Sequence, residues 1–111
     1  NAKYQHRSIG NGISIGGKHD GIDSNTGTLL EVKNRTSERI FRKQEPPMYD
    51  VIQTMCYMYI YRIDKAKIIE NYRGEMKETT IEWDDELWAN VVEKLYAFME
   101  RYKEFCNKNR K

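Results

Sequence analysis

The sequence contains little cysteine, proline or histidine. Among its 111 residues there are two of each. Cys56 and Cys106 are far apart and neither belongs to a CxxC motif, so we expect reduced thiols and no disulfide framework. His6 and His19 are isolated from any His/Cys cluster, which argues against a zinc site. The same scarcity argues against an iron–sulfur cluster, which normally uses four cysteine thiolates.

Long apolar runs are also absent. The longest uncharged stretch, residues 51–61, is rich in tyrosine and shorter than the ~18 residues that a membrane-spanning helix needs. The first residues carry no secretory or transit signature. We therefore expect a soluble intracellular domain without a membrane partner. The length favours a single domain, 1–111, with one core and a radius of gyration of roughly 13 Å.

The charges are nearly balanced overall but segregated along the chain. The 19 basic and 17 acidic side chains leave a net charge of +2, too small to indicate a nucleic-acid partner. Residues 33–43, however, carry five cations and one anion, whereas residues 75–86 carry six anions and one cation. A basic block is either a solvated face or a binding surface for phosphates. If DNA binds, we expect the acidic block to point away from it.

The pattern of apolar residues predicts alternating strands and helices. The expected elements are strands at 12–15 and 28–34, a helix from 48, strands at 66–72 and 76–83, and a helix capped by Asp84 or Asp85. Residues 36–45 form a polar connection. The helix after Pro46–Pro47 has an apolar stripe at positions 48, 51, 52, 55 and 59, and the last helix has its core side at positions 88, 91, 92, 95, 98 or 99, 102 and 105. This order predicts an α/β or α+β domain with a mixed central β-sheet and flanking α-helices.

Charged side chains gather on one face of the first strand pair. Side chains alternate along a strand, so Glu31 and Lys33 project to the same face. The turn at Ser24–Gly27 closes a hairpin that brings Asp20 beside them. Two adjacent carboxylates suit Mg²⁺ or Mn²⁺, and a nearby lysine can position a water or offset phosphate charge. Asp23 is a rival for the acid at Asp20, although it lies nearer the turn.

The spacing Asp20, ten residues, then Glu31–Val32–Lys33 resembles the PD-(D/E)XK nuclease superfamily. Further along, Gln53 on the predicted helix resembles the glutamine motif of the branch that includes phage lambda exonuclease, YqaJ-type viral recombinases and RecB nuclease domains. The resemblance covers roughly residues 12–61. His19 stands where the superfamily often has proline.

The resemblance implies a restriction-endonuclease-like core and a divalent-metal-dependent deoxyribonuclease. It implies that Asp20, Glu31 and the Val32 carbonyl hold Mg²⁺ or Mn²⁺, that Lys33 positions the attacking water, and that Gln53 orients the water or the lysine. We expect an exonuclease of viral or phage recombination or repair, with DNA and a recombinase or single-strand annealing protein as partners. An oligomer is compatible with this branch. The expected DNA-backbone contacts are Arg35, Arg39, Arg42 and Lys43.

The same branch usually has a further metal-ligating glutamate on a helix before the first strand. No acidic residue precedes Asp20, so we expect the chain to be a fragment lacking that helix. This departure leaves three alternatives open. One is a non-catalytic DNA-binding module with the same fold, another is a structure-specific endonuclease, and the third is a protein-interaction domain that uses the C-terminal helix.

Overall fold

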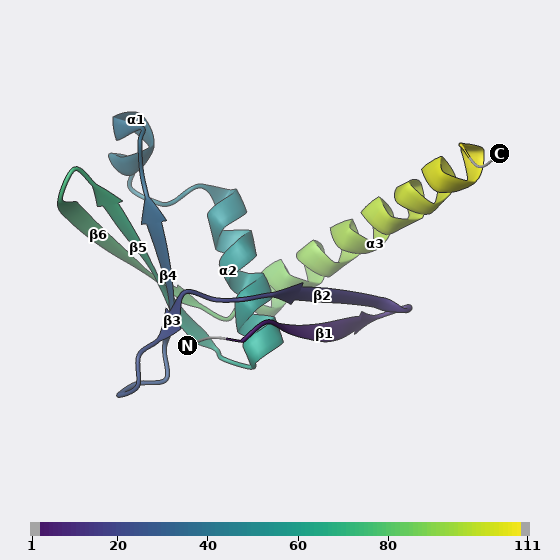
Figure 1. Cartoon of the computed structure of the whole chain (residues 1–111), viewed down its shortest axis with the longest axis horizontal. Coiled ribbons are helices and arrows are strands. Elements are labelled where there is room, and N and C mark those ends of the chain that lie inside the picture. Colours follow the sequence, from purple (N-terminus) through teal and green to yellow (C-terminus); the bar gives the residue numbers. More distant parts are fainter. Residues whose placement is uncertain (1–2, 110–111) are drawn as a thin grey trace.

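The computed structural model of the chain describes residues 3–109, which form six strands and three helices (Figure 1). The strands are β1 (Gln5–Gly10), β2 (Ile13–Gly17), β3 (Gly21–Ile22), β4 (Leu29–Asn34), β5 (Lys65–Tyr72) and β6 (Glu75–Glu82). The helices are α1 (Glu38–Phe41), α2 (Met48–Tyr61) and α3 (Asp85–Lys108). The expected elements are confirmed to within a few residues at their ends.

Four strands form a mixed sheet in the order β3-β4-β5-β6. β4 and β5 are parallel, with Leu29 opposite Ala66, and the other neighbours are antiparallel. Parallel neighbours need a crossover connection, and α2 lies within it. The chain is therefore a mixed α/β fold with a mixed sheet and flanking helices, as the sequence predicts.

A second pair of strands, β1 and β2, forms a separate antiparallel hairpin. The sequence pattern predicted β2 but not its partner. Asn11 and Gly12 at the turn both have positive φ, 52° and 73°, which two-residue hairpin turns of the Asn-Gly type require. The hairpin packs on α2 through Gly17, where a Cβ would lie 2.5 Å from a ring carbon of Tyr57. Glycine is needed there for this close approach.

The core lies between the sheet and α2. Its buried centre consists of Leu29, Met55, Met58 and Ala66. The apolar stripe expected on α2 is only partly correct, because Met48 is 61% exposed while Thr54 is fully buried. The sheet covers α2 on one side and the β1–β2 hairpin covers it on another, so its buried surface is wider than one stripe.

The connection at 36–45 is more structured than the sequence suggests. The short helix α1 begins at Ser37, whose hydroxyl accepts a hydrogen bond from the Ile40 amide. Phe41, at the end of α1, is buried and stacks on Tyr72 of β5 with ring centroids 5.5 Å apart. The buried ring of Phe41, together with hydrogen bonds from Lys77 of β6 to the Phe41 and Lys43 carbonyls, holds this segment against the sheet.

Helix α3 begins as predicted, with the Asp84 carboxylate accepting a hydrogen bond from the Leu87 amide. The expected core side is wrong beyond its first turns. Phe98, Tyr102 and Phe105 are 55%, 52% and 63% exposed, because the second half of α3 extends away from the sheet (Figure 1). This projection gives the molecule a radius of gyration of 16.2 Å, larger than the roughly 13 Å expected for a compact chain of this length.

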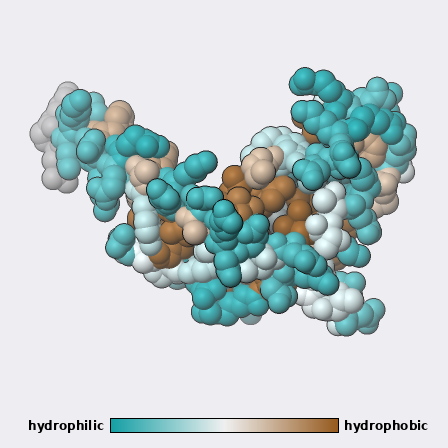
Figure 2. Space-filling model, turned by 180° about the vertical axis from the view of Figure 1, so that it is seen from behind, coloured by the Kyte–Doolittle hydropathy of each residue, from teal (hydrophilic) through white to brown (hydrophobic). Residues whose placement is uncertain are grey.

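An open apolar groove lies where α2 and α3 meet. It has a volume of about 700 Å³ and is lined mainly by Met48, Ile52, Leu87, Val91, Leu95 and Phe98. Seen from behind, hydrophobic surface gathers in the middle of the molecule, between the projecting end of α3 and the sheet (Figure 2). Within the described residues, no helix combines the length and the apolar character needed to cross a bilayer.

Candidate active site

Strand β4 places the two charged residues of its motif on the face that carries the core. Leu29 and Glu31 are buried, with Glu31 only 3% exposed, whereas Val32 on the opposite face is 45% exposed. Lys33 follows Glu31 on the inner face and is partly buried. The predicted alternation along this strand is therefore confirmed.

Asp20 lies beside this motif because it directly precedes β3, the antiparallel neighbour of β4. One Asp20 carboxylate oxygen accepts a hydrogen bond of 2.8 Å from the Val32 amide. The Asp20 amide in turn donates one of 3.1 Å to Oε1 of Glu31. The β3–β4 hairpin thus holds the two carboxylates next to each other. Asp23, the rival acid, instead accepts a hydrogen bond from the Asn25 amide within the turn.

Gln53 reaches the same place from α2. Its side-chain oxygen accepts a 2.6 Å hydrogen bond from Nζ of Lys33. Its amide nitrogen lies 3.5 Å from the hydroxyl of Tyr57, one helical turn further on. Tyr57 was not among the predicted site residues, although its spacing of four residues from Gln53 could have indicated it. Three separate segments therefore bring Asp20, Glu31, Lys33 and Gln53 together, with Tyr57 beside them.

Burial dominates the electrostatics of this site, and the charge of Lys33 offsets part of the negative charge of its carboxylates. Burial raises the pKa of the Glu31 carboxyl; the hydrogen bond from the Asp20 amide works against this, and the charges of Asp20 and Asp50 add to the rise. Burial also raises the pKa of Tyr57, and the charge of Glu31 raises it further. A cation placed between the carboxylates would relieve both effects.

The oxygen atoms of the site suit a hard divalent cation. Asp20 and Glu31 each use one carboxylate oxygen in the hydrogen bonds above, and the other accepts none from residues 3–109. Carboxylate and carbonyl oxygens are the ligands that Mg²⁺ and Mn²⁺ prefer. The residues therefore fit such an ion, although only two carboxylates contribute. Across residues 3–109, no three His, Cys, Asp or Glu side chains cluster as a metal site by themselves.

Behind the site lies a buried ionic network that the sequence did not predict, made of Arg35, Asp50, Glu70 and Lys77. Arg35 donates hydrogen bonds of 2.8 Å to both Asp50 and Glu70, which are 3% and 0% exposed. Lys77 lies 3.5 Å from Glu70. Asp50 also lies 3.7 Å from Nζ of Lys33, so the ionic network touches the site directly.

Arg35 was expected to contact DNA, and its position in the structure is different. Its side chain is 10% exposed and occupied by the two carboxylates. Burial lowers the pKa of Arg35, but the hydrogen bonds to Asp50 and Glu70 outweigh this and raise it. The carboxylates of Asp50 and Glu70 compensate the charge of Arg35 and allow this residue to lie in the interior, away from a surface where DNA could bind.

The rest of the basic block is on the surface. Arg39 and Lys43 are exposed. Arg42 forms a two-bond pair with Glu75 at 2.7 and 2.8 Å. The β5–β6 turn thus brings Glu75, one residue of the acidic block, next to α1 and the basic block.

His19 is buried between the site and the core. It is 6% exposed and meets the ring of Tyr61 edge-on, with centroids 4.3 Å apart. Burial lowers the pKa of His19, while the charge of Asp20 works against this. Its Nδ1 has no hydrogen-bond partner in the described part of the chain.

Comparison with known proteins bears on the fold. No family model matches the chain, and no curated protein matches it. Among solved structures, the crystal structure of SSO0001 is similar, with a TM-score of 0.65 and 22% sequence identity. The similarity covers 82% of this chain and 44% of that one, so the chain spans less than half of that structure's length. A likeness at this identity concerns the fold alone.

Proposed function

We propose that this chain is the core of a divalent-metal-dependent deoxyribonuclease with a restriction-endonuclease-like sheet. The observation that carries the proposal is the convergence of Asp20, Glu31, Lys33 and Gln53. These residues come from three segments, and the Lys33–Gln53 hydrogen bond of 2.6 Å joins residues 20 positions apart.

The carboxylates of Asp20 and Glu31, with the carbonyl of Val32, would hold Mg²⁺ or Mn²⁺. When bound, such an ion lowers the pKa of a water and stabilises the anionic transition state of phosphodiester hydrolysis. Lys33 positions the attacking water and offsets charge on the phosphate. Gln53 fixes the lysine ammonium, because its oxygen accepts one of the three ammonium protons.

The ionic network supports this geometry from behind. Arg35 joins Asp50 of α2 to Glu70 of β5, so it fixes the helix that carries Gln53 to the strand next to β4. For the DNA backbone we retain the exposed Arg39 and Lys43 as contacts, with Arg42 available on release of Glu75. Exonuclease action in recombination or repair, together with a recombinase or annealing protein as partner, belongs to the same proposal and follows from the resemblance.

A second candidate is a non-catalytic DNA-binding module with the same fold. It is favoured by the small number of ligands, since only two carboxylates meet at the site within residues 3–109. In this version the acids remain without a functional metal.

The test is cleavage of linear and circular DNA by the natural full-length protein with Mg²⁺ or Mn²⁺. Glu31→Ala and Lys33→Ala should each abolish cleavage. The matched controls are Glu78→Ala and Lys67→Ala, which alter an exposed Glu/Lys pair on β5 and β6 with 3.6 Å between its charged atoms. If all four variants cleave DNA at the wild-type rate, the nuclease proposal is refuted. Preference for linear DNA identifies an exonuclease, and cleavage of circles an endonuclease.

Metal binding separates the two candidates. Titration with Mn²⁺, followed by calorimetry, should show saturable binding that Asp20→Asn removes. DNA binding without cleavage and without Asp20-dependent Mn²⁺ binding would favour the non-catalytic module instead.

A further inference from the structure

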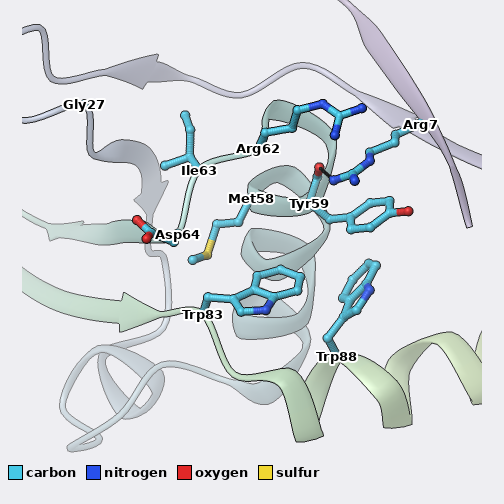
Figure 3. A pocket seen from close by; sticks show the side chains of 9 residues that line it. All are labelled: Arg7, Gly27, Met58, Tyr59, Arg62, Ile63, Asp64, Trp83 and Trp88. Carbon is cyan, nitrogen blue, oxygen red and sulfur yellow. Dashed lines mark hydrogen bonds between the residues drawn. The ribbon is translucent and has the colours of Figure 1, made fainter.

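A second cavity lies at the C-terminal end of α2, and none of the residues of the candidate active site lines it. Its volume is about 540 Å³, within the range of small-molecule pockets. We call it the aromatic pocket; its lining, drawn in Figure 3, is Arg7, Gly27, Met58, Tyr59, Arg62, Ile63, Asp64, Trp83 and Trp88. Most of these residues come from β1, the end of α2 and the junction of β6 with α3.

Aromatic rings form one wall of the aromatic pocket. Tyr59 and Trp88 are stacked with centroids 4.7 Å apart, and Trp83 lies 5.3 Å from Trp88. The indole N–H of Trp83 donates a 2.7 Å hydrogen bond to Asp85, which fixes the plane of that ring. Met58 and Ile63 add apolar surface. A fixed ring beside an apolar surface suits a planar, uncharged ring such as a nucleobase.

Two arginines and one acid provide the charge. Arg7 stacks over Tyr59 at 4.0 Å, and its guanidinium donates one hydrogen bond, to the Tyr59 carbonyl at 2.8 Å. Arg62 is exposed at the end of α2 and Asp64 is exposed two residues later. Within residues 3–109, none of these three forms an ion pair. The aromatic pocket therefore has a net positive charge, and guanidinium groups have the geometry to bind a phosphate.

We propose that the aromatic pocket binds a nucleotide, with the base against Trp83 and the phosphate at Arg7 and Arg62. Asp64 accepts a hydrogen bond from an N–H group on the edge of the base. The ligand is either a free mononucleotide or an unpaired nucleotide within a single strand, since both have the same base and phosphate. The proposal does not depend on the nuclease assignment, because it uses different residues and no metal.

The sequence provides a direct probe of this proposal. Trp83 and Trp88 are the only two tryptophans of the chain, and both line the aromatic pocket. A base that stacks there should quench the tryptophan fluorescence of the whole protein. The titration is done with EDTA present, so that neither cleavage nor metal binding contributes to the signal. The probes are dAMP, adenosine and a short oligo(dT).

Arg62→Gly is the variant that tests the proposed phosphate contact most directly. Arg62 has a left-handed backbone with φ of 60°, which glycine adopts without strain, so the variant should fold. Its matched control is Arg73→Gly, which removes the same charge at φ of 48° in the β5–β6 turn, outside the aromatic pocket.

We expect saturable quenching of tryptophan fluorescence by dAMP, by oligo(dT) or by both. The affinity should be about tenfold lower in Arg62→Gly, because a charge-assisted hydrogen bond to the phosphate is lost. Arg73→Gly should match the wild type, and adenosine should bind more weakly than dAMP. Saturation by dAMP identifies a free-nucleotide pocket, and saturation by oligo(dT) alone identifies a strand contact. Absence of saturable quenching, or equal affinity in Arg62→Gly and Arg73→Gly, overturns the proposal.

Discussion

Replacement of Arg35 by methionine tests the ionic network most directly. The side chain of methionine keeps much of the volume of the arginine stem but lacks the guanidinium. Asp50 and Glu70, 3% and 0% exposed, would each lose a 2.8 Å hydrogen bond from Arg35. Both would remain in the interior as charges, which is costly unless they are paired.

The expected loss follows from the partners that remain. Removal of one member of a buried ion pair typically costs about 3–5 kcal/mol. Here Lys33 still lies 3.7 Å from Asp50 and Lys77 lies 3.5 Å from Glu70, so part of the charge stays compensated. We therefore expect a loss near the lower limit, about 3 kcal/mol, which is a large part of the ~5–15 kcal/mol by which domains are usually stable.

Urea unfolding followed by circular dichroism measures this loss, with an unchanged m-value as the sign that unfolding stays two-state. The triple variant R35M/D50N/E70Q removes the unpaired charges and should recover most of the stability. Arg39→Met, at an exposed position of α1, is the control and should change stability by less than ~0.5 kcal/mol. A loss below ~1 kcal/mol in Arg35→Met, or a triple variant no more stable than the single one, would refute the reasoning.

Three further predictions concern other parts of the molecule. In metal-free buffer, Glu31→Gln should be more stable than the wild type. The raised pKa of Glu31 means that folded protein holds this proton more tightly, so wild-type stability falls as pH rises from the ordinary value of 4.5 through the raised one. The stability that the variant gains over the wild type should therefore grow across that window, by up to about 1.4 kcal/mol for each pH unit, and then level off. Melting temperatures measured across the window check this, and a gain that does not change with pH contradicts it. Phe105→Ser should change the free energy of unfolding by less than ~0.5 kcal/mol, whereas Met55→Ala should lower it by about 2–5 kcal/mol, since their exposures are 63% and 0%. In the folded protein, the half-buried Cys56 should react with a thiol reagent more slowly than the exposed Cys106, because burial raises the pKa of Cys56; equal rates would exclude this.

The local parts of the fold and of the site could be predicted from the sequence. Alternation along one strand was enough to place Glu31 and Lys33 on the inner face, and the turn residues were enough to return the chain past Asp20. The start of α2 could be predicted from Pro46 and Pro47, which directly precede it. These features depend on neighbouring residues, where steric and hydrogen-bonding preferences act directly.

The missed features depend on partners far along the chain. Arg35 looked like any other residue of a basic block, because its partner Glu70 is 35 positions away. The apolar side of α3 was correctly recognised as apolar, but such a pattern does not say whether another element covers it. Phe105 is exposed because the sheet and α2 end before the helix does.

The parallel pairing of β4 with β5 also sets the order in which the chain can fold. The hairpins β1–β2, β3–β4 and β5–β6 join neighbouring segments, whereas the pairing of Leu29 with Ala66 must close the long crossover. Non-local pairings of this kind form slowly. We therefore expect Asp20 and Glu31 to meet early, within a hairpin, and Gln53 to reach Lys33 only with the last docking step. In a nascent chain, Asp20 and Glu31 would therefore be adjacent before Gln53 and Lys33 complete the site.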